Sequence, residues 1–429
     1  MNKEKIIEIL NSEILPATGC TEPGALAYAA AVAAAYLGGE APESITVLAS
    51  RNVFKNAMGA GIPGTGLTGM EYAAALGAFG GDPKRELQVL KDISPEALRR
   101  AKSFVEDKKV RVGIADTLEK VYIDITLKGK TSASQAVISG THTNIILIKQ
   151  NGRTVKCSES SEAGTDLSFE TIKSILSVSS CYEFAEALDT ENDPIDVIRS
   201  CIAANRAISE EGLKNDYGLR IGKTLREEMD EGLIGDSLVT YATLMTAAGA
   251  DARMSGASFT VFSNSGSGNQ GIAVTMPVVA VAERIGASED RTLRAVALSN
   301  LITIYIKSKF GRLSAYCGAT VAGMGAACGA AYLLGGGLEA IEAAIRNMIG
   351  DVTGMLCDGA KADCALKIST CTNAALHSAL MAVRGISVQK TDGIVSESVE
   401  ESIENFAALG NRGSACIDPL VLEMMLNKK

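Results

Sequence analysis

Apolar residues recur along this chain at two spacings, and the spacing changes twice. Residues 3–14 (KEKIIEILNSEI) are apolar at helical spacing, and Pro16 predicts the end of that helix. Residues 25–37 (ALAYAAAVAAAYL) are apolar on nearly every face, which predicts a buried helix. From about Leu167 onward the pattern is again almost entirely helical, rich in alanine and interrupted by glycine.

Between these helical parts, apolar and polar residues alternate as they do in strands. The clearest case is 121–129 (VYIDITLKG), and extended structure is also expected over 44–54, 109–116 and 144–150. Asn151-Gly152 predicts a hairpin turn. The sequence therefore predicts an α+β fold: a mainly helical catalytic domain formed by 1–42 and 159–429, and an inserted β-rich module at 43–158 with helices at about 67–105.

Composition excludes several classes of function. The 429 residues carry a net charge of -9 with no basic block and no tryptophan, which disfavours nucleic-acid binding. The start of the chain leads directly into a charged helix, so we expect no secretory signal and a cytoplasmic location. The uncharged stretch 313–337 is built mainly from small residues, which predicts a buried helix rather than a membrane span. In a chain of this kind, the ten cysteines are expected to be free thiols or metal ligands rather than to form disulfides.

The first glycine-rich segment is 59–66 (GAGIPGTG), with Thr65 as a candidate substrate-binding side chain. Although it contains GxGxxG, no hydrophobic strand runs directly into the first glycine, and Pro63 stiffens the loop. This favours a ligand loop or a plain turn over a nucleotide site.

A second polar loop, 265–271 (SGSGNQG), precedes an apolar helix expected from Ile272. Backbone amides at such a helix start suit a carboxylate or a phosphate. A flexible linker is the alternative. The candidate substrate-binding residues here are Ser265, Ser267 and Asn269. For His142 and His377, a structural role is the default interpretation.

Five cysteines fall within one region: Cys317, Cys328, Cys357, Cys364 and Cys371. The chain has no CxxC, which disfavours thioredoxin chemistry and zinc ribbons. Cysteines seven residues apart on an unbroken helix lie about 10 Å apart, so Cys371 is expected in the core. A break at 358–361 could bring Cys357 and Cys364 together, joined by either Cys317 or Cys328. Alternatively, all five are simply buried small residues.

Cys20 lies between two predicted helices, just before a helix start. The helix dipole at that position favours the thiolate, which could serve as a base or a nucleophile. A structural thiol remains possible from position alone.

Four motifs together resemble the L-cysteine desulfidase family, which is related to the iron–sulfur L-serine dehydratase alpha chains. They are ATGCTEPGA (17–25), GAGIPGTG (59–66), SGSGNQG (265–271) and CDGAKADCALKIST (357–370), and the match covers essentially the whole chain. The resemblance implies a mainly helical fold around a [4Fe–4S] cluster held by the cysteines matching Cys317, Cys357 and Cys364. It also implies that the cysteine matching Cys20 is the proton acceptor.

By this resemblance the protein is a carbon–sulfur lyase that converts L-cysteine to pyruvate, ammonia and sulfide. Cys20 would be the base, and an open iron the Lewis acid. One alternative is L-serine dehydratase activity by the same chemistry. Others are a pyridoxal-phosphate lyase, with Lys309 as the candidate lysine, and a non-catalytic iron–sulfur sensor. The expected partner is a small amino acid, without nucleic acid or membrane. The sequence leaves open the oligomeric state, a homo-oligomer included, and the role of Cys416.

Overall fold

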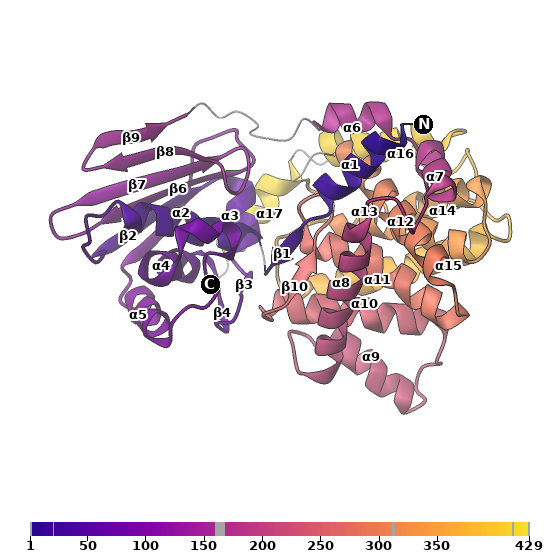
Figure 1. Ribbon diagram of the computed structural model, residues 1–429, viewed down its shortest axis with the longest axis horizontal. Coiled ribbons are helices and arrows are strands. Elements are labelled where there is room, and N and C mark those ends of the chain that lie inside the picture. Colours follow the sequence, from indigo (N-terminus) through magenta and orange to yellow (C-terminus); the bar gives the residue numbers. More distant parts are fainter. Residues whose placement is uncertain (1, 20, 159–167, 311–313, 414–415, 428–429) are drawn as a thin grey trace.

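The computed structural model describes residues 2–19, 21–158, 168–310, 314–413 and 416–427. It consists of a larger helical body and a smaller module in which helices pack on a sheet, and the two lie side by side (Figure 1). This confirms the predicted α+β class.

The module contains a six-stranded sheet in the order β5-β2-β6-β7-β8-β9, antiparallel except for the β2–β5 pair. The strands are β2 (Ser44–Ala49), β5 (Val110–Ile114), β6 (Tyr122–Lys128), β7 (Ala133–Ser139), β8 (Ile145–Gln150) and β9 (Arg153–Cys157). Asn151 and Gly152 have φ angles of 50° and 78°, so the predicted hairpin turn is confirmed. Strand β7 was not predicted, because its alternation of apolar and polar residues is weak.

The strand predicted over 44–54 is too long. It ends at Ala49, because the Ser50 side chain accepts a hydrogen bond from the Val53 N–H and caps the helix α3 (Arg51–Ala57). The predicted helical region at 67–105 is interrupted as well. It begins with a two-residue strand and then forms separate helices: α4 (Met70–Gly80), a 3₁₀ segment (Pro83–Gln88) and α5 (Pro95–Glu106).

Helix α2 (Thr21–Ala35) packs on the module sheet. Its Leu26 and Ala30 share a hydrophobic core with Val47 and Ile125 of the strands. The outer strand β9 is exposed along its whole length. The domain division remains a prediction, but this packing places α2 with the module although it precedes residue 43.

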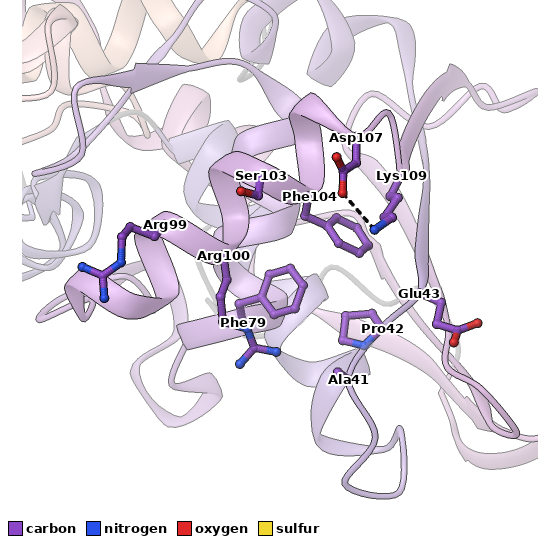
Figure 2. A pocket seen from close by; sticks show the side chains of 10 residues that line it. All are labelled: Ala41, Pro42, Glu43, Phe79, Arg99, Arg100, Ser103, Phe104, Asp107 and Lys109. Atoms are coloured by element: carbon purple, nitrogen blue, oxygen red, sulfur yellow. Dashed lines mark hydrogen bonds and ion pairs between the residues drawn. The ribbon is translucent and has the colours of Figure 1, made fainter.

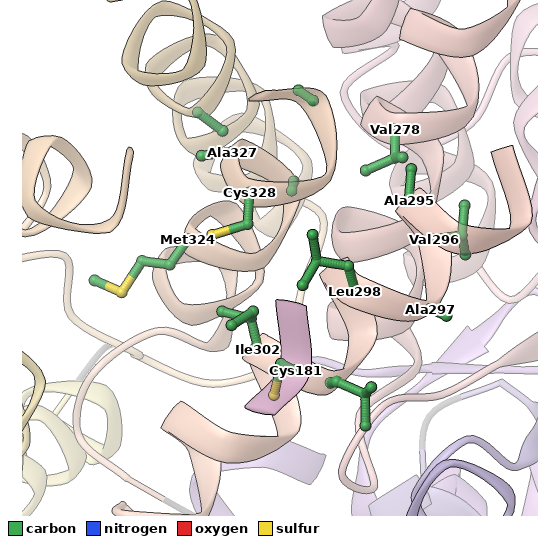
Figure 3. Close-up of a cluster of buried hydrophobic side chains, with 14 of the residues drawn as sticks. Cys181, Val278, Ala295, Val296, Ala297, Leu298, Ile302, Met324, Ala327 and Cys328 are labelled. Atoms are coloured by element: carbon green, nitrogen blue, oxygen red, sulfur yellow. The ribbon is translucent and has the colours of Figure 1, made fainter. Parts of the chain in front are cut away.

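The helical body is built around α13 (Gly318–Leu333), which lies inside the stretch 313–337 and is almost entirely buried. Its glycines allow close packing on α12 (Glu289–Ser308), since a Cβ at Gly325 would overlap the Ser299 carbonyl and the Thr303 hydroxyl. Figure 3 shows Cys328 and Met324 of α13 in the same buried cluster as Leu298 and Ile302 of α12. None of the described helices is long and apolar enough to cross a membrane.

In the part of the chain that the structure describes, ten further helices complete this body. They are α1 (Lys3–Glu13), α6 (Phe169–Ile175), α7 (Val178–Ala187), α8 (Asp196–Lys214), α9 (Ile221–Asp230), α10 (Leu238–Met254), α11 (Gly268–Ile285), α14 (Leu338–Asp351), α15 (Cys364–Ala382) and α16 (Val399–Ala408).

Segments near the two ends of the chain contribute to the contact between the body and the module. Near the N-terminus, β1 (Pro16–Thr18) pairs with β10 (Thr260–Phe262) of the helical body just before the chain enters α2. At the C-terminus, α17 (Ile417–Leu426) packs on α3 of the module (Figure 1). Two segments from the terminal regions of the chain, β1 and α17, therefore lie where the two parts meet.

Candidate functional site

Cys317 and Cys357 lie on two short segments that pair with each other. The Cys317 N–H donates to the Met355 carbonyl at 2.9 Å, and the Cys357 N–H donates to the Ala315 carbonyl at 2.8 Å. A β-bridge between the intervening residues completes this contact. Cys317 is therefore brought to Cys357 by backbone pairing across forty positions of sequence, which no local pattern indicates.

Cys364 joins this pair as the first residue of α15. The turn before it contains Gly359 (φ 101°), whose carbonyl lies 3.6 Å from the Cys364 sulfur. Burial raises the pKa of Cys364 to about 11, and the neighbouring Cys357 adds to the rise. Burial also raises the pKa of Cys317, with Cys357 as the next cause. The break expected at 358–361 thus does fold the chain back, and three thiols gather.

These three thiols fit an iron–sulfur cluster by the chemistry of the donor set, because cysteine thiolates are the usual cluster ligands. The described side chains include no group of three or more His, Cys, Asp or Glu arranged around a single ion. A cluster does not require one, since each cysteine would bind a different iron. Their role as ligands stays a prediction.

Cys328 and Cys371 lie elsewhere in their helices. Cys328 is buried in the middle of α13, and its sulfur contacts the Ile341 carbonyl. Cys371 is buried two turns into α15 beside Thr320 and Met355. Of the two open candidates for the third position, the structure brings Cys317 rather than Cys328 to the pair.

The four sequence motifs converge on the C-terminal end of α10. Gly256 accepts a hydrogen bond from the Gly64 N–H of the 59–66 loop at 3.0 Å. Met254 forms a small buried cluster with Ala60 of that loop, and Cys364 packs against this cluster. Arg253 contacts the other two motifs. This segment was missed in the sequence, although an arginine within the largely apolar run LMTAAGADARM is a usable signal.

Arg253 is buried, and its guanidinium joins the first motif to the third. Nη2 donates to the Gly19 carbonyl at 2.7 Å, and Nη1 donates to the Asn269 side-chain oxygen at 2.9 Å. Gly19 has a φ of 73°, and a Cβ there would overlap the ring of Pro63. The backbone immediately before Cys20 is thus wedged between α10 and the 59–66 loop.

Cys20 itself lies outside the described residues. Helix α2 begins at Thr21, so the expectation of a helix start directly after this cysteine is confirmed. Thr21 therefore belongs to the first turn. The role of Cys20 as a base stays a prediction.

The predicted substrate-binding side chains are mostly engaged within their own loops. The Ser265 hydroxyl donates to the Asn264 side-chain oxygen, and the Ser267 hydroxyl caps α11 by accepting from the Gln270 N–H. The Thr65 hydroxyl donates to the Ile62 carbonyl. Only Asn269 of these four has a side-chain partner on another element, Arg253. Substrate contacts by all four stay predictions.

The 59–66 segment contains β3 (Gly61–Ile62) and the turn at 63–66 that joins it in a small hairpin to β4 (Leu67–Thr68). It follows helix α3, whereas a dinucleotide loop follows a strand and opens a helix. The preference for a turn or ligand loop over a nucleotide site is therefore supported.

Charged side chains hold the cysteine-bearing turn from outside. The buried Lys55 donates to the Cys357 carbonyl at 3.2 Å and pairs with Asp418 of α17 at 2.6 Å. Asp358 pairs with Lys361 and Lys367. Burial is the largest influence on the pKa of Asp358 and raises it, but the two ammonium groups outweigh burial and bring the pKa to about 2. The turn is thus fixed to both the body and the module.

The remaining candidates have no described contact with the three thiols. His142 is in the turn between β7 and β8, and His377 is exposed on α15. Cys416 is exposed just before α17. Lys309 forms an ion pair with Glu404 at 2.5 Å, which offers no support for a Schiff-base lysine.

A cavity of about 690 Å³ lies on the module (Figure 2). Arg99, Arg100 and Lys109 line it together with Phe79 and Phe104, and the Arg100 guanidinium stacks 4.7 Å from the Phe79 ring centre. None of the predicted site residues lines it, so this cavity is separate from the convergence of the four motifs.

Comparison with known proteins identifies the class. The chain matches the family model described as serine dehydratase alpha chain over residues 84–423, and it belongs to that family. Membership of this family indicates that the protein is a lyase-type enzyme similar to serine dehydratase. Proteins of the family generally bind iron–sulfur clusters.

Curated relatives cover the whole chain. A protein named "UPF0597 protein" from Oleidesulfovibrio alaskensis is 43% identical over 428 residues, which is 99% of this chain and 98% of the relative. A protein of the same name from Porphyromonas gingivalis is 43% identical over 433 residues, covering 100% of this chain and 99% of the relative. These names state no activity and no substrate.

Proposed function

We propose that this protein catalyses iron–sulfur-dependent β-elimination of L-cysteine to pyruvate, ammonia and sulfide, with a [4Fe–4S] cluster on Cys317, Cys357 and Cys364. The observation that carries the proposal is the meeting of three thiols with the segments that precede Cys20 and form the 265–271 loop. Thiol ligands, a candidate base and a polar loop are the parts that such a reaction needs.

The protein residues divide the work. Cys20 takes the α-proton, and departure of the β-thiolate then gives aminoacrylate, which tautomerises and is hydrolysed to pyruvate and ammonia. The Gly19 carbonyl, directly before Cys20 in the sequence, accepts a hydrogen bond from Arg253. When bound, a cluster with three protein ligands supplies one iron as a Lewis acid for the leaving group.

L-serine is the second candidate substrate, because the matched family bears the serine dehydratase name. The same steps apply, with the hydroxyl in place of the thiolate. The two differ in leaving group alone, so both must be assayed on one preparation.

The test is anaerobic reconstitution with iron and sulfide, followed by assays of pyruvate from L-cysteine and from L-serine. Sulfide release equal to pyruvate from cysteine, at a higher kcat/KM than with serine, supports the proposal. A higher kcat/KM with serine replaces it by the serine reaction. A reconstituted protein that bound iron but turned over neither would instead be a non-catalytic iron–sulfur protein.

Cys20→Ala separates the base from the ligands. We expect iron content to persist while elimination falls by about 10³-fold, because general-base catalysis typically contributes 10²–10⁴-fold. If Cys20→Ala lost iron as well, Cys20 would be a ligand. Retained activity would show that another group takes the proton.

A further inference from the structure

Arg253 is a buried cation that has no ion-pair partner among the described residues. It is 5% exposed, and its hydrogen bonds go to the neutral oxygens of Gly19 and Asn269 and, at 3.7 Å, to the Met254 sulfur. Among the described residues no carboxylate forms an ion pair with it, and Nε has no acceptor. Buried charges in proteins are normally paired, so this arrangement is incomplete as it stands.

A purely structural role could explain part of this arrangement of Arg253. Arg253 is in the last turn of α10, where the helix dipole favours a positive charge, and its hydrogen bonds clamp two loops together. Neither effect supplies an acceptor for Nε. An arginine has five N–H donors, and the three hydrogen bonds satisfy at most part of them. The clamp therefore accounts for Nη1 and for part of Nη2, but not for the remaining edge of the guanidinium.

The unsatisfied edge lies against a glycine. A Cβ at Gly268 would overlap Nε and come within 2.8 Å of Nη2, so any larger residue would press on that edge. Gly268 is the first residue of α11, and the amides of a helix start favour an anion. A guanidinium edge and a helix start thus face the same region, one from α10 and one from α11.

The neighbouring residues place this edge beside the proposed reaction. Met254, next to Arg253, forms a small buried cluster with Ala60 against which Cys364 packs, and Gly19 directly precedes Cys20. An amino acid whose β-group faces the thiol cluster and whose α-carbon faces Cys20 would have its carboxylate left to bind. A guanidinium is the side chain best suited to a carboxylate, which it can bind through two parallel hydrogen bonds.

We propose that Arg253 binds the α-carboxylate of the amino-acid substrate and thereby selects α-amino acids with a free carboxylate. This rests on the proposed function, since it assigns a part of the same site. In this account Asn269 is a positioning residue, which holds the guanidinium through Nη1 and leaves the Nε side for the ligand.

The test compares each carboxylate ligand with its amide. On the anaerobically reconstituted protein, kcat/KM is measured for L-cysteine and L-cysteinamide, or for the serine pair if serine is the better substrate. Arg253→Gln should reduce the acid-to-amide ratio by about 100-fold, and Arg253→Lys by less, because lysine keeps the charge without the fork. Arg294→Gln is the matched control, since Arg294 also binds backbone carbonyls between helices but has its own carboxylate partner, Asp290.

A binding readout separates this proposal from the proposed function. L-alanine has the carboxylate but no leaving group, and at saturation it should raise the Tm of the wild type by about 2 °C. L-alaninamide should not, and Arg253→Lys should respond less to L-alanine. Gly268→Ala keeps the arginine but blocks the Nε edge of its guanidinium, so this variant should also lose the L-alanine response. It serves as the test if Arg253→Gln does not fold.

The outcomes are distinct. Preserved discrimination between acid and amide in folded Arg253→Gln, or an unchanged L-alanine shift in both Arg253→Lys and Gly268→Ala, would show that the clamp is purely structural. If the wild type turned over neither amino acid yet its L-alanine shift depended on Arg253, the proposed function would fail while the carboxylate site stood.

Discussion

Two buried regions of this protein contain cysteines, and they are built differently. In the helical core, Cys181 and Cys328 lie within helices among aliphatic side chains (Figure 3). At the junction, Cys317 and Cys364 lie at helix ends and Cys357 on a short bridged segment.

Burial raises the pKa of Cys328 and also those of Cys317 and Cys364. Burial therefore does not distinguish a core thiol from a candidate ligand. What distinguishes them is the convergence of chain segments at helix ends, where several thiols can approach one group.

The largest expected effect is at the thiols themselves. Cys364→Ala should lower the iron content of the reconstituted protein by more than half and activity by more than about 100-fold, because it removes a proposed cluster ligand outright. Cys371 lies two turns further along α15. Cys371→Ala should keep the iron and lower the free energy of unfolding by about 1 kcal/mol, because it leaves a small cavity. Iron analysis with thermal unfolding checks both, and equal iron loss in the two variants would break the comparison.

Within the core, close helix packing is the feature to test. Gly325→Ala should lower the free energy of unfolding by about 3 kcal/mol, because its Cβ would overlap the α12 backbone carbonyl of Ser299. Gly235→Ala is the control, since no atom lies within 4 Å of that Cβ. Denaturant unfolding measures both. A neutral Gly325→Ala would mean that α12 and α13 can move apart at little cost.

At the junction, Lys55 fixes the cysteine-bearing turn to α17. Lys55→Met should cost about 2 kcal/mol, since it removes one partner of an ion pair in which Lys55 is 3% and Asp418 27% exposed. We also expect faster proteolysis at α17 and faster loss of iron in air. Lys173→Met, which removes an exposed pair with Glu170, should change none of these.

Asp251 of α10, two residues before Arg253, gives the smallest effect. Burial raises its pKa to about 6 from 3.8, although it accepts a hydrogen bond from the Gly222 N–H. The folded state therefore holds the proton more tightly than the unfolded state. The free energy of unfolding that Asp251 contributes is therefore fully present below pH 4 and is lost as the pH rises from 4 to about 6. Above that pH, Asp251 causes no further change in stability with pH.

Asp251→Asn cannot titrate. Relative to the wild type, its free energy of unfolding should rise by about 1 kcal/mol between pH 4 and pH 7. This is less than the full pKa shift of about two units would give, because local relaxation offsets part of the cost of burying the carboxylate. Urea unfolding at the two pH values measures this. A difference independent of pH would show that Asp251 is ionised in the fold throughout this range.

Much of the local structure could be read from the sequence. Helix α1, the buried α13, strands β6 and β8 and the Asn151-Gly152 turn follow from periodicity and turn chemistry. The exclusion of Cys371 by helical rise also agrees with its buried position on the unbroken α15. Strand β7 and the end of β2 were missed, because in them capping and pairing outweigh a weak or ambiguous pattern.

The sequence by itself determined the elements, the candidate thiols and the four motifs, because helix rise, turn residues and hydrophobic period act over a few positions. Only the tertiary structure decided that α2 packs with the module, that Cys317 rather than Cys328 meets Cys357, and that Arg253 joins the loops of Gly19 and Asn269. Each of these depends on backbone pairing or side-chain packing between distant segments. Periodicity tells that a face is buried, but not which segment covers it.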